Sequence, residues 1–417
     1  MRIALAVRGW RGLLARVFDG RGAGATIAGT TSIGHAPSLA GALPAQPSGQ
    51  AARRWLLVDV TLPRPDRDSG SLRSWNLMRL LRAEGHRVDF LPDDGAGGGD
   101  YAAALRGLGV NLIAGTERGA LAQWFARHLA GYEVLVVSRY HLAEFLIPLA
   151  RAVAPDVRVV LDTVDLHHLR EQREAALRAH RGLQRLARTT RERELAAIGD
   201  ADVTWVVSAV EAGMLRAALP DARVVLLPNI HEPLAAPRGY DGRGGLLFVG
   251  GARHPPNVDA VEWLLQDVFP RVRAQLPACE LHLVGDGLSG LPAARQAPAG
   301  VVIHDHVPDL SPLLDSCLVG LAPLRYGAGV KGKVNMYMAH GLAVVATGSA
   351  VEGAFLEHGR DVLVAEDAAG LAEAVLAACG NRHLWEHLVG NGMANVQTHF
   401  SFDAARLAVA ETLEMLR

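Results

Sequence analysis

Short apolar runs alternate with segments of helical periodicity along most of this sequence, and no other feature restricts the available folds as strongly. Each run is about as long as one β-strand and is bounded by residues that favour turns. This alternation predicts an α/β architecture with mainly parallel sheets covered by helices on both faces. The expected strands are 55–60, 87–90, 110–113, 133–138, 157–161, 203–207, 223–227, 246–249, 280–284, 301–304, 317–322 and 343–346.

The chain is long enough for two domains, because 417 residues exceed the usual size of one hydrophobic core. The segment 228–245 contains three prolines and four glycines without clear periodicity, so we place the linker between the domains there. The expected division is a first domain at 53–232, a second at 233–400 and a final helix at 401–417.

The N-terminal segment differs in composition from the rest of the chain. No acidic residue lies between Asp19 and Asp59, and residues 23–52 are rich in Ala, Gly, Ser and Pro, so residues 1–52 are expected to be a disordered or weakly amphipathic leader. Within residues 3–17, apolar residues recur at helical spacing with arginines between them, which is typical of a basic helix that could contact an anionic membrane. The alternative is an extension without a role.

Charge and cysteine content exclude several classes of function. The 42 basic residues are balanced by 43 acidic ones, so the chain lacks an overall basic field for a nucleic-acid partner. Three cysteines far apart, without a CxxC motif, argue against a zinc site or a disulfide framework and fit the cytoplasm. His304 and His306 lack further nearby ligands, so no metal site is expected. No apolar run approaches the ~20 residues that span a bilayer, which leaves at most peripheral contact with the inner face of the plasma membrane.

The stretch 323–353 concentrates the residues that indicate chemistry. An apolar strand leads into a loop with Gly327, Gly329, Lys331 and Lys333, followed by a helical segment and a second strand. Glycines let backbone N–H groups approach a ligand, a helix N-terminus attracts anions, and lysines add full charges. The loop therefore predicts a phosphate or diphosphate site, although a glycine-rich turn with solvated lysines has the same composition. It is not a nucleoside-triphosphate loop, because no hydroxyl residue follows the lysine at the required spacing.

The loop resembles that of the group 1 (family four) glycosyltransferases, especially a bacterial subgroup that carries APLRYGAGVKGKVN (322–335), followed by GxxVVAT (341–347) and EG (352–353). The resemblance extends over residues 55–408. It implies the GT-B fold, in which two Rossmann-like doubly wound domains face each other across a cleft and the C-terminal helix crosses back to the first domain. It also implies transfer of a sugar from a nucleotide-diphosphate sugar with retention of configuration, without a cofactor or a metal.

The same resemblance implies the residues of the donor site. The donor diphosphate, expected to belong to a UDP- or GDP-sugar, would lie between the loop after 246–249 and the loop at 323–333. The loop after 301–304 would hold the nucleotide base, largely through backbone groups. Carried over residue by residue, the donor-binding residues are Gly250, Gly251, Arg253, Val307, Arg325, Gly327, Gly329, Lys331 and Lys333.

Candidates for catalysis follow the strand 157–161, at the sheet edge where ligands of parallel sheets bind. Asp165, His167 and His168 could orient an acceptor or move a proton there. The structural alternative is a helix capped by Asp165, with one buried and one surface histidine. Glu352 is the candidate for contact with donor hydroxyls or the leaving group. The resemblance adds an acceptor-side loop, which an ordinary capped helix start would also explain, formed by Ser69, Gly70, Ser71 and Arg73.

Two stretches do not fit the family pattern simply. Many group 1 enzymes carry two glutamates around the central loop, one of which binds the donor ribose, and the matching positions here are Ala328 and Met336. The stretch 170–195 is rich in Arg and Glu and is expected to be one solvated helix, with contact to an anionic lipid-linked acceptor as the alternative.

Three functions agree with these patterns. The first is a glycosyltransferase of bacterial surface polysaccharide or glycoconjugate synthesis, acting on a glycan, lipid-linked or protein acceptor. The second is a catalytically silent GT-B module that binds a nucleotide sugar or glycan, which the absent glutamates favour and the lysine loop disfavours. The third is a nucleotide-sugar epimerase, which would need no acceptor.

Overall fold

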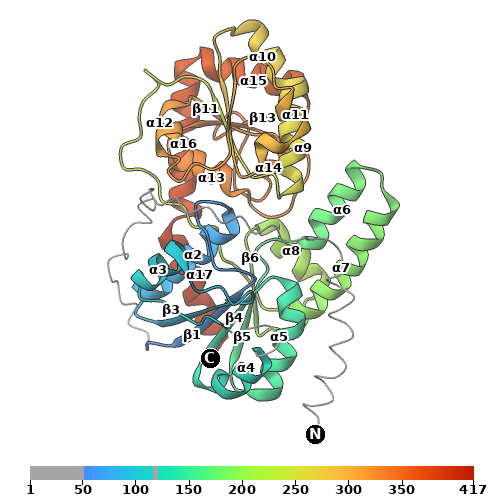
Figure 1. The fold of residues 1–417 in the computed structure, drawn as a ribbon, viewed down its shortest axis with the longest axis vertical. Helices are drawn as coiled ribbons and strands as arrows, with labels where there is room; N and C mark the ends of the chain where they lie inside the picture. Colours follow the sequence, from blue (N-terminus) through green and yellow to red (C-terminus); the bar gives the residue numbers. More distant parts are fainter. Residues whose placement is uncertain (1–50, 116–120) are drawn as a thin grey trace. The chain divides into compact units, whose positions relative to one another are not determined.

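Two parallel β-sheets form the framework of the described structure, residues 51–115 and 121–417 of a computed structural model (Figure 1). The first sheet contains β1 (Arg54–Asp59), β2 (Arg87–Pro92), β3 (Asn111–Leu112), β4 (Val134–Ser138), β5 (Arg158–Asp162), β6 (Val203–Val206) and β7 (Val224–Leu226). The second contains β8 (Leu246–Val249), β9 (Leu281–Val284), β10 (Val301–His304), β11 (Val319–Ala322), β12 (Ala343–Ala346) and β13 (Leu363–Val364). The predicted α/β class with two Rossmann-like units is confirmed. The strand β13 was not predicted.

Strand order places a crossover point in the middle of each sheet. The orders are β3-β2-β1-β4-β5-β6-β7 and β10-β9-β8-β11-β12-β13, and every pair is parallel. The chain therefore leaves β8 towards one edge of its sheet and returns beside it at β11. Loops that follow such neighbouring strands open a crevice at their carboxyl ends, which is where ligands of this architecture bind.

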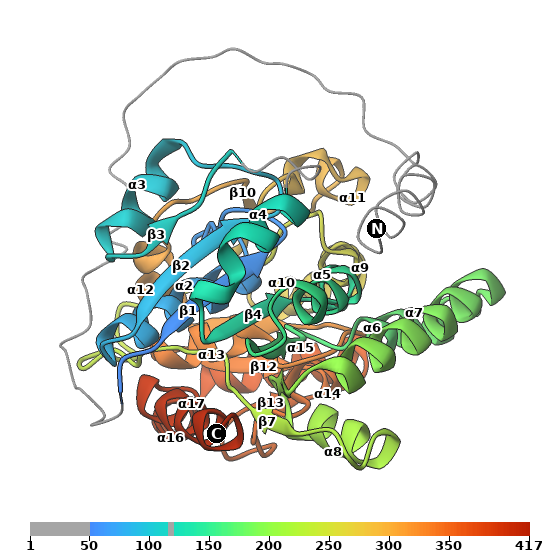
Figure 2. The same cartoon turned by 90° about the horizontal axis from the view of Figure 1, so that it is seen from below.

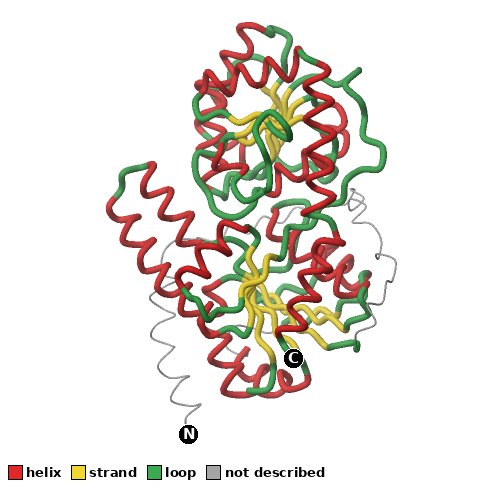
Figure 3. Tube along the Cα trace, turned by 180° about the vertical axis from the view of Figure 1, so that it is seen from behind, coloured by secondary structure: helices red, strands yellow, loops and turns green. Residues whose placement is uncertain are grey.

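Helices lie on both sides of each sheet (Figure 3). In β1, Trp55 and Leu57 enter one apolar cluster while Leu56 and Val58 enter another, so both faces of the first sheet are buried. The helices of the first domain are α2 (Ser69–Ala83), α3 (Gly99–Gly107), α4 (Leu121–His128), η1 (Leu129–Gly131), α5 (Tyr140–Val153), α6 (His167–Leu177), α7 (Arg181–Asp200) and α8 (Ala209–Ala218). Those that follow are α9 (Pro255–Trp263), η2 (Leu264–Val268), α10 (Phe269–Gln275), η3 (Leu288–Gly290), α11 (Pro292–Arg295), α12 (Ser311–Ser316), α13 (Gly332–Ala339), α14 (Gly348–Val351), α15 (Ala368–Gly380), α16 (Arg382–His399) and α17 (Phe402–Met415).

The stretch 170–195 is not the single helix that its charge pattern predicted. It is divided between α6 and α7, which lie side by side as a hairpin (Figure 2). Ala179 adopts a positive φ of 50° in the turn, and the His180 ring accepts a hydrogen bond from the backbone of Leu183 to cap α7. Continuous helical periodicity in a polar stretch does not reveal such a reversal, because one positive-φ residue is enough to produce it.

The last helix returns to the first domain, as the resemblance implied. Phe402, Val409 and Leu413 of α17 belong to the same apolar cluster as Trp55 of β1, and Trp205 of β6 donates a hydrogen bond to the hydroxyl of Thr412 at 2.8 Å. The preceding helix α16 instead packs in the core around the second sheet. The predictions for residues 1–50 lie outside the described residues. Within the described ranges, no helix is long and apolar enough to cross a membrane.

Candidate active site

The loop after β8 depends on Gly250 for its close packing. At Gly250 a Cβ atom would lie 2.6 Å from Cγ of Asn257, so a larger residue would displace that side chain. The Asn257 amide donates a hydrogen bond to the carbonyl oxygen of Gly251 at 3.1 Å. Arg253, a predicted phosphate ligand in this loop, is exposed to solvent and therefore accessible to an anion.

The loop after β11 lies against the first domain. A Cβ atom at Gly329, where φ is 65°, would lie 3.0 Å from Val207 and 3.2 Å from Cβ of Asp165. The ammonium group of Lys331 donates hydrogen bonds to the carbonyl oxygens of Ala328 and Gly329 at 2.9 and 2.7 Å. The glycines thus bring the loop at 323–333, called the anion loop below because it is predicted to bind a diphosphate, next to Asp165 of the opposite domain.

Two lysines meet at this loop, and they are the only lysines in the sequence. Burial lowers the pKa of Lys331 to about 8, although the carboxylates of Glu211 and Asp165 oppose the shift. Burial and repulsion from Lys331 lower the pKa of Lys333 to about 7. Lys333 donates to Oδ1 of Asn257 at 2.7 Å and lies 4.1 Å from the centre of the Phe248 ring. An anion bound here would stabilise the charged form of both lysines.

Asp165 lies next to Gly329 of the opposite domain as a charged group. It forms an ion pair with Arg170, and one carboxylate oxygen lies 3.4 Å from Nδ1 of His167. Burial would raise the pKa of Asp165, but Arg170, His167 and Arg139 outweigh it and hold the pKa below its usual value. The carboxylate is therefore ionised at neutral pH and can accept hydrogen bonds from a hydroxyl.

His168 is part of the packing between α6 and α7. Its Nδ1 lies 2.6 Å from Oε2 of the buried Glu194. Glu194 also accepts the backbone N–H groups of His167 and His168, each at 3.1 Å, and so caps the start of α6. The helix cap is therefore supplied from α7 and not by Asp165.

Arg73 is buried and occupied by protein groups. Its guanidinium donates to both carboxylate oxygens of Asp162 at 2.9 Å and to the carbonyl oxygen of Leu227 at 2.9 Å. Both side chains of the ion pair are about 2% exposed. Arg73 thus joins α2 to the end of β5 and to the start of the linker, and it offers no free donor to an acceptor.

The start of α2 faces the second domain at Ser69, while Gly70 packs against Arg139 of the first domain. Asp68, rather than Ser69 or Ser71, caps the helix, because its carboxylate accepts the backbone N–H and the hydroxyl of Ser71 at 2.8 Å. A Cβ atom on Gly332, at the first residue of α13, would lie 3.0 Å from Cβ of Ser69. A Cβ atom at Gly70 would lie 2.9 Å from the Arg139 guanidinium. This loop therefore lines the cleft opposite the anion loop.

Sequence reasoning missed Glu211 on α8. Its Oε1 accepts the backbone N–H of Leu166 at 3.1 Å, while its buried Oε2 has no hydrogen-bond partner among the described residues. Burial raises the pKa of Glu211 to about 7, and Asp165 raises it further while Lys331 opposes the shift. The Ser-x-x-Glu pattern at 208–211 is a capping-box signal, which indicates a helix start and nothing about contact with Lys331.

Arg173, also missed, connects α6 to the second domain. Its guanidinium donates to Oε1 of Glu352 at 2.8 Å and to the carbonyl oxygen of Gly327 at 2.6 Å. The predicted catalytic carboxylate is thus held by a cation from the opposite domain. A cavity of about 600 Å³ lies beside this pair. It is lined by Arg173, Ala176, Leu177, Arg325, Gly348, Ser349 and Glu352.

Further polar contacts connect the loops of the two domains. Arg67, in the loop after β1, donates to both carboxylate oxygens of Asp286 at 2.8 Å. His306 lies 3.3 Å from the carboxylate of Asp66. Val307, the predicted base contact, follows directly and is half-buried against the core of the second domain.

Three other predicted positions are engaged in packing. Arg325 forms an ion pair with Asp259 at 2.5 Å, and its guanidinium carbon lies 5.3 Å from the centre of the Trp263 ring. Ala328 is buried in an apolar cluster of the first domain, and Met336 packs against the core of the second. A glutamate at Ala328 would therefore be buried, whereas Met336 is only partly buried. Among the described residues no group of three or more His, Cys, Asp or Glu could hold a metal ion.

Comparison with known proteins agrees with this geometry. Residues 243–381, which include both loops of the second domain, match the family model described as glycosyl transferases group 1. An uncharacterized 44.6 kDa protein in the cps region of Klebsiella pneumoniae is 24% identical over 194 residues, which are 43% of this chain and 49% of that protein. The match thus spans about half the length of that relative.

Solved structures share the fold over most of the chain. Sucrose-phosphate synthase from Thermosynechococcus elongatus is 17% identical with a TM-score of 0.66, and the match covers 87% of this chain and 99% of that one. HepE from Anabaena, in complex with UDP and glucose, is 13% identical with a TM-score of 0.64 and the same coverage. A glycosyltransferase from Rickettsia africae is 12% identical with a TM-score of 0.60, over 88% and 99% of the two chains. Residues 243–381 thus resemble group 1 glycosyltransferases in sequence, and the solved structures share the GT-B fold of the chain.

Proposed function

We propose that this protein transfers a sugar from a nucleotide-diphosphate sugar to a glycan, lipid-linked or protein acceptor, with retention of configuration, in the synthesis of a bacterial surface polysaccharide or glycoconjugate. The relative from a cps region supports the polysaccharide role. HepE complexes with UDP and with UDP-glucose support a nucleotide-sugar donor. The three free cysteines agree with action in the cytoplasm, at most peripheral to the membrane.

The observation that carries the proposal is the position of Lys331 and Lys333 at the start of α13, where Lys333 donates to Asn257, the residue that also binds the loop after β8. A diphosphate between the loops after β8 and β11 would supply negative charge that stabilises the charged forms of the two lysines. Lys331, Arg253 and the N–H groups of the α13 N-terminus would then stabilise the departing diphosphate without a metal.

On the other side of the cleft, Asp165 would orient the acceptor. Its ionised carboxylate can accept a hydrogen bond from the attacking hydroxyl, and His167 lies next to it. Ser69 would border the same space, since it faces the start of α13. His168 would act only by positioning α6 through Glu194.

A binding titration of UDP, GDP, ADP and CMP tests the proposal. One diphosphate should bind, and Lys331→Ala should weaken it by about 1–3 kcal/mol, the usual penalty for losing one charged hydrogen bond. Arg382→Ala, which removes an exposed arginine of α16, is the matched control and should leave affinity unchanged. If none of the four nucleotides binds, the transferase proposal is wrong.

The silent GT-B module is a second candidate, favoured by the apolar packing of Ala328 and Met336 and by the pairing of Glu352 with Arg173. Nucleotide binding with no turnover across a broad panel of donor sugars and acceptors would establish it. Release of an altered nucleotide sugar without an acceptor would instead establish the epimerase.

A further inference from the structure

The outer part of the α6–α7 hairpin carries a concentration of unpaired positive charge. Residues 175–191 contain five arginines and no acidic residue. Arg178 pairs with Glu174 at 3.0 Å. The other four are exposed, and within the described part of the chain they form no ion pair: Arg181, Arg185, Arg188 and Arg191. Elsewhere on the hairpin, arginines have acidic partners. The predicted solvated helix with alternating opposite charges therefore does not describe residues 175–191.

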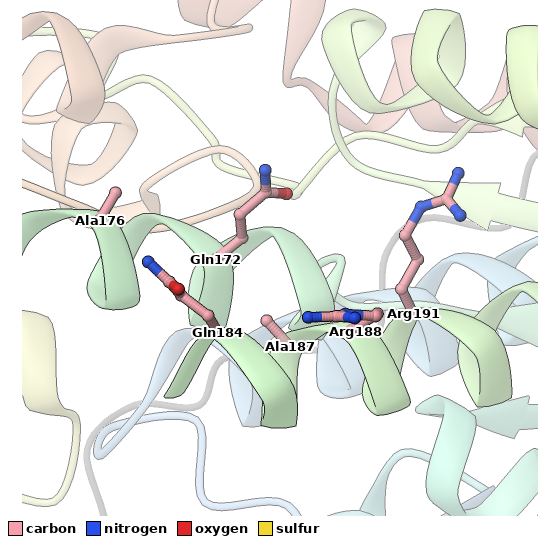
Figure 4. A pocket seen from close by; sticks show the side chains of 6 residues that line it. All are labelled: Gln172, Ala176, Gln184, Ala187, Arg188 and Arg191. Atoms are coloured by element: carbon pink, nitrogen blue, oxygen red, sulfur yellow. The ribbon is translucent and has the colours of Figure 1, made fainter. Parts of the chain in front are cut away.

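Two of these arginines border a groove between the helices (Figure 4). The groove encloses about 400 Å³. Ala176 and Ala187 are small enough to leave it open, and the side-chain amides of Gln172 and Gln184 stand around it with Arg188 and Arg191. On α7 the lining residues recur at 184, 187, 188 and 191, the spacing of one helix face. The groove therefore presents two guanidinium groups, two amides and no carboxylate.

The groove adjoins the candidate active site. Ala176 also lines the cavity beside Arg173 and Glu352, so the two hollows meet at one residue of α6. One turn earlier, Arg173 donates to the carbonyl oxygen of Gly327 in the anion loop. Because a helix rises ~5.4 Å per turn, a single acceptor molecule could reach from the groove to the cleft.

We propose that the groove between α6 and α7 binds the phosphate or diphosphate group of the acceptor, while the hydroxyl-bearing end of the acceptor passes the cavity beside Arg173 and Glu352 and reaches Asp165. Guanidinium forks match phosphate oxygens in pairs and stay charged at every physiological pH. The proposal rests on the proposed transferase function and narrows its acceptor to a phosphorylated molecule. A phosphorylated glycan and a lipid-linked sugar share this chemistry.

The test is a titration of the full chain with inorganic pyrophosphate and with farnesyl diphosphate, repeated in the Lys331→Ala background, where the donor site binds a diphosphate only weakly. The variant Arg188→Ala/Arg191→Ala should weaken both probes at least tenfold. The control Arg181→Ala/Arg185→Ala removes the same charge from the same helix outside the groove, and should weaken them less than threefold. Circular dichroism of each variant shows whether the hairpin is folded.

Each result decides the proposal. Tighter binding of farnesyl diphosphate than of pyrophosphate supports a lipid-linked acceptor, and equal binding supports a soluble phosphorylated one. The groove site is wrong if neither probe binds the wild type, if the groove variant binds as tightly as the wild type, or if both double variants lose affinity equally. An equal loss of affinity would indicate that the positive charge of the whole helix attracts anions, as in binding to an anionic membrane surface. Nucleotide affinity, measured separately, depends on Lys331, so failure of the donor site is distinguished from failure of the groove.

Discussion

The guanidinium of Arg173 forms an ion pair with the carboxylate of Glu352, with Nη2 2.8 Å from Oε1 and Nη1 2.5 Å from Oε2. Arg173 belongs to the first domain and Glu352 to the second, and both are little more than one quarter exposed. Because the same guanidinium also binds the carbonyl oxygen of Gly327, one side chain holds two parts of the second domain beside the cleft.

Removing this pair should affect catalysis more than stability. Arg173→Ala should change the free energy of unfolding by less than about 1 kcal/mol, since partly exposed ion pairs contribute little. It should lower kcat/KM for sugar transfer about tenfold or more, because Glu352 and the anion loop lose their common donor. A double-mutant cycle with Glu352→Ala measures the coupling. Losses that simply add would contradict a joint role.

Nucleotide affinity should fall as the pH rises from 7 to 9. The free protein has lysine pKa values of about 8 at Lys331 and about 7 at Lys333, so both are increasingly neutral over this range. A bound diphosphate favours the charged forms, so binding takes up protons and weakens by about tenfold or more across these two units. Calorimetric titrations at several pH values measure both effects. Lys331→Arg stays charged and should show a smaller pH dependence.

Amine-reactive labelling offers an independent view of the same loop, because Lys331 and Lys333 are the only lysines. Their lowered pKa values predict rapid modification near pH 7.5, since only the neutral amine reacts. A saturating nucleoside diphosphate should slow the reaction several-fold, as followed by mass spectrometry of the loop peptide. The α-amino group is the internal control. Unchanged lysine labelling with bound nucleotide would place the nucleotide elsewhere.

Arg73 should be a stability residue. Arg73→Ala leaves the carboxylate of Asp162 buried without its partner, which costs about 3–5 kcal/mol for buried pairs of this kind. Urea unfolding should show a lower midpoint with an unchanged slope. Arg382→Ala, at an exposed pair, should leave the midpoint nearly unchanged. A small effect at Arg73, together with a large loss of transfer, would restore the acceptor role predicted from the sequence.

Local pattern was sufficient for the two-sheet fold and for the position of the anion loop. Apolar runs become strands of parallel sheets, and the carboxyl ends of β8 and β11 must meet because of the crossover between them. Gly250, Gly329 and Lys331 are therefore neighbours of the cleft for reasons visible in the chain. The α6–α7 hairpin could not be predicted from the sequence, because the chain reverses direction at a single turn with one positive-φ residue.

The sequence by itself determined the elements and the loops that bear charge, because hydrophobic periodicity and glycine placement act over a few residues. Only the tertiary structure decided which charged side chains are free and which are neutralised by distant partners. Asp162 pairs with Arg73, Glu194 with His168 and Glu352 with Arg173, and the partners of each pair are more than twenty residues apart in the sequence. A charge is available to a ligand only when folding brings no partner to it, and that depends on long-range packing that no local pattern records.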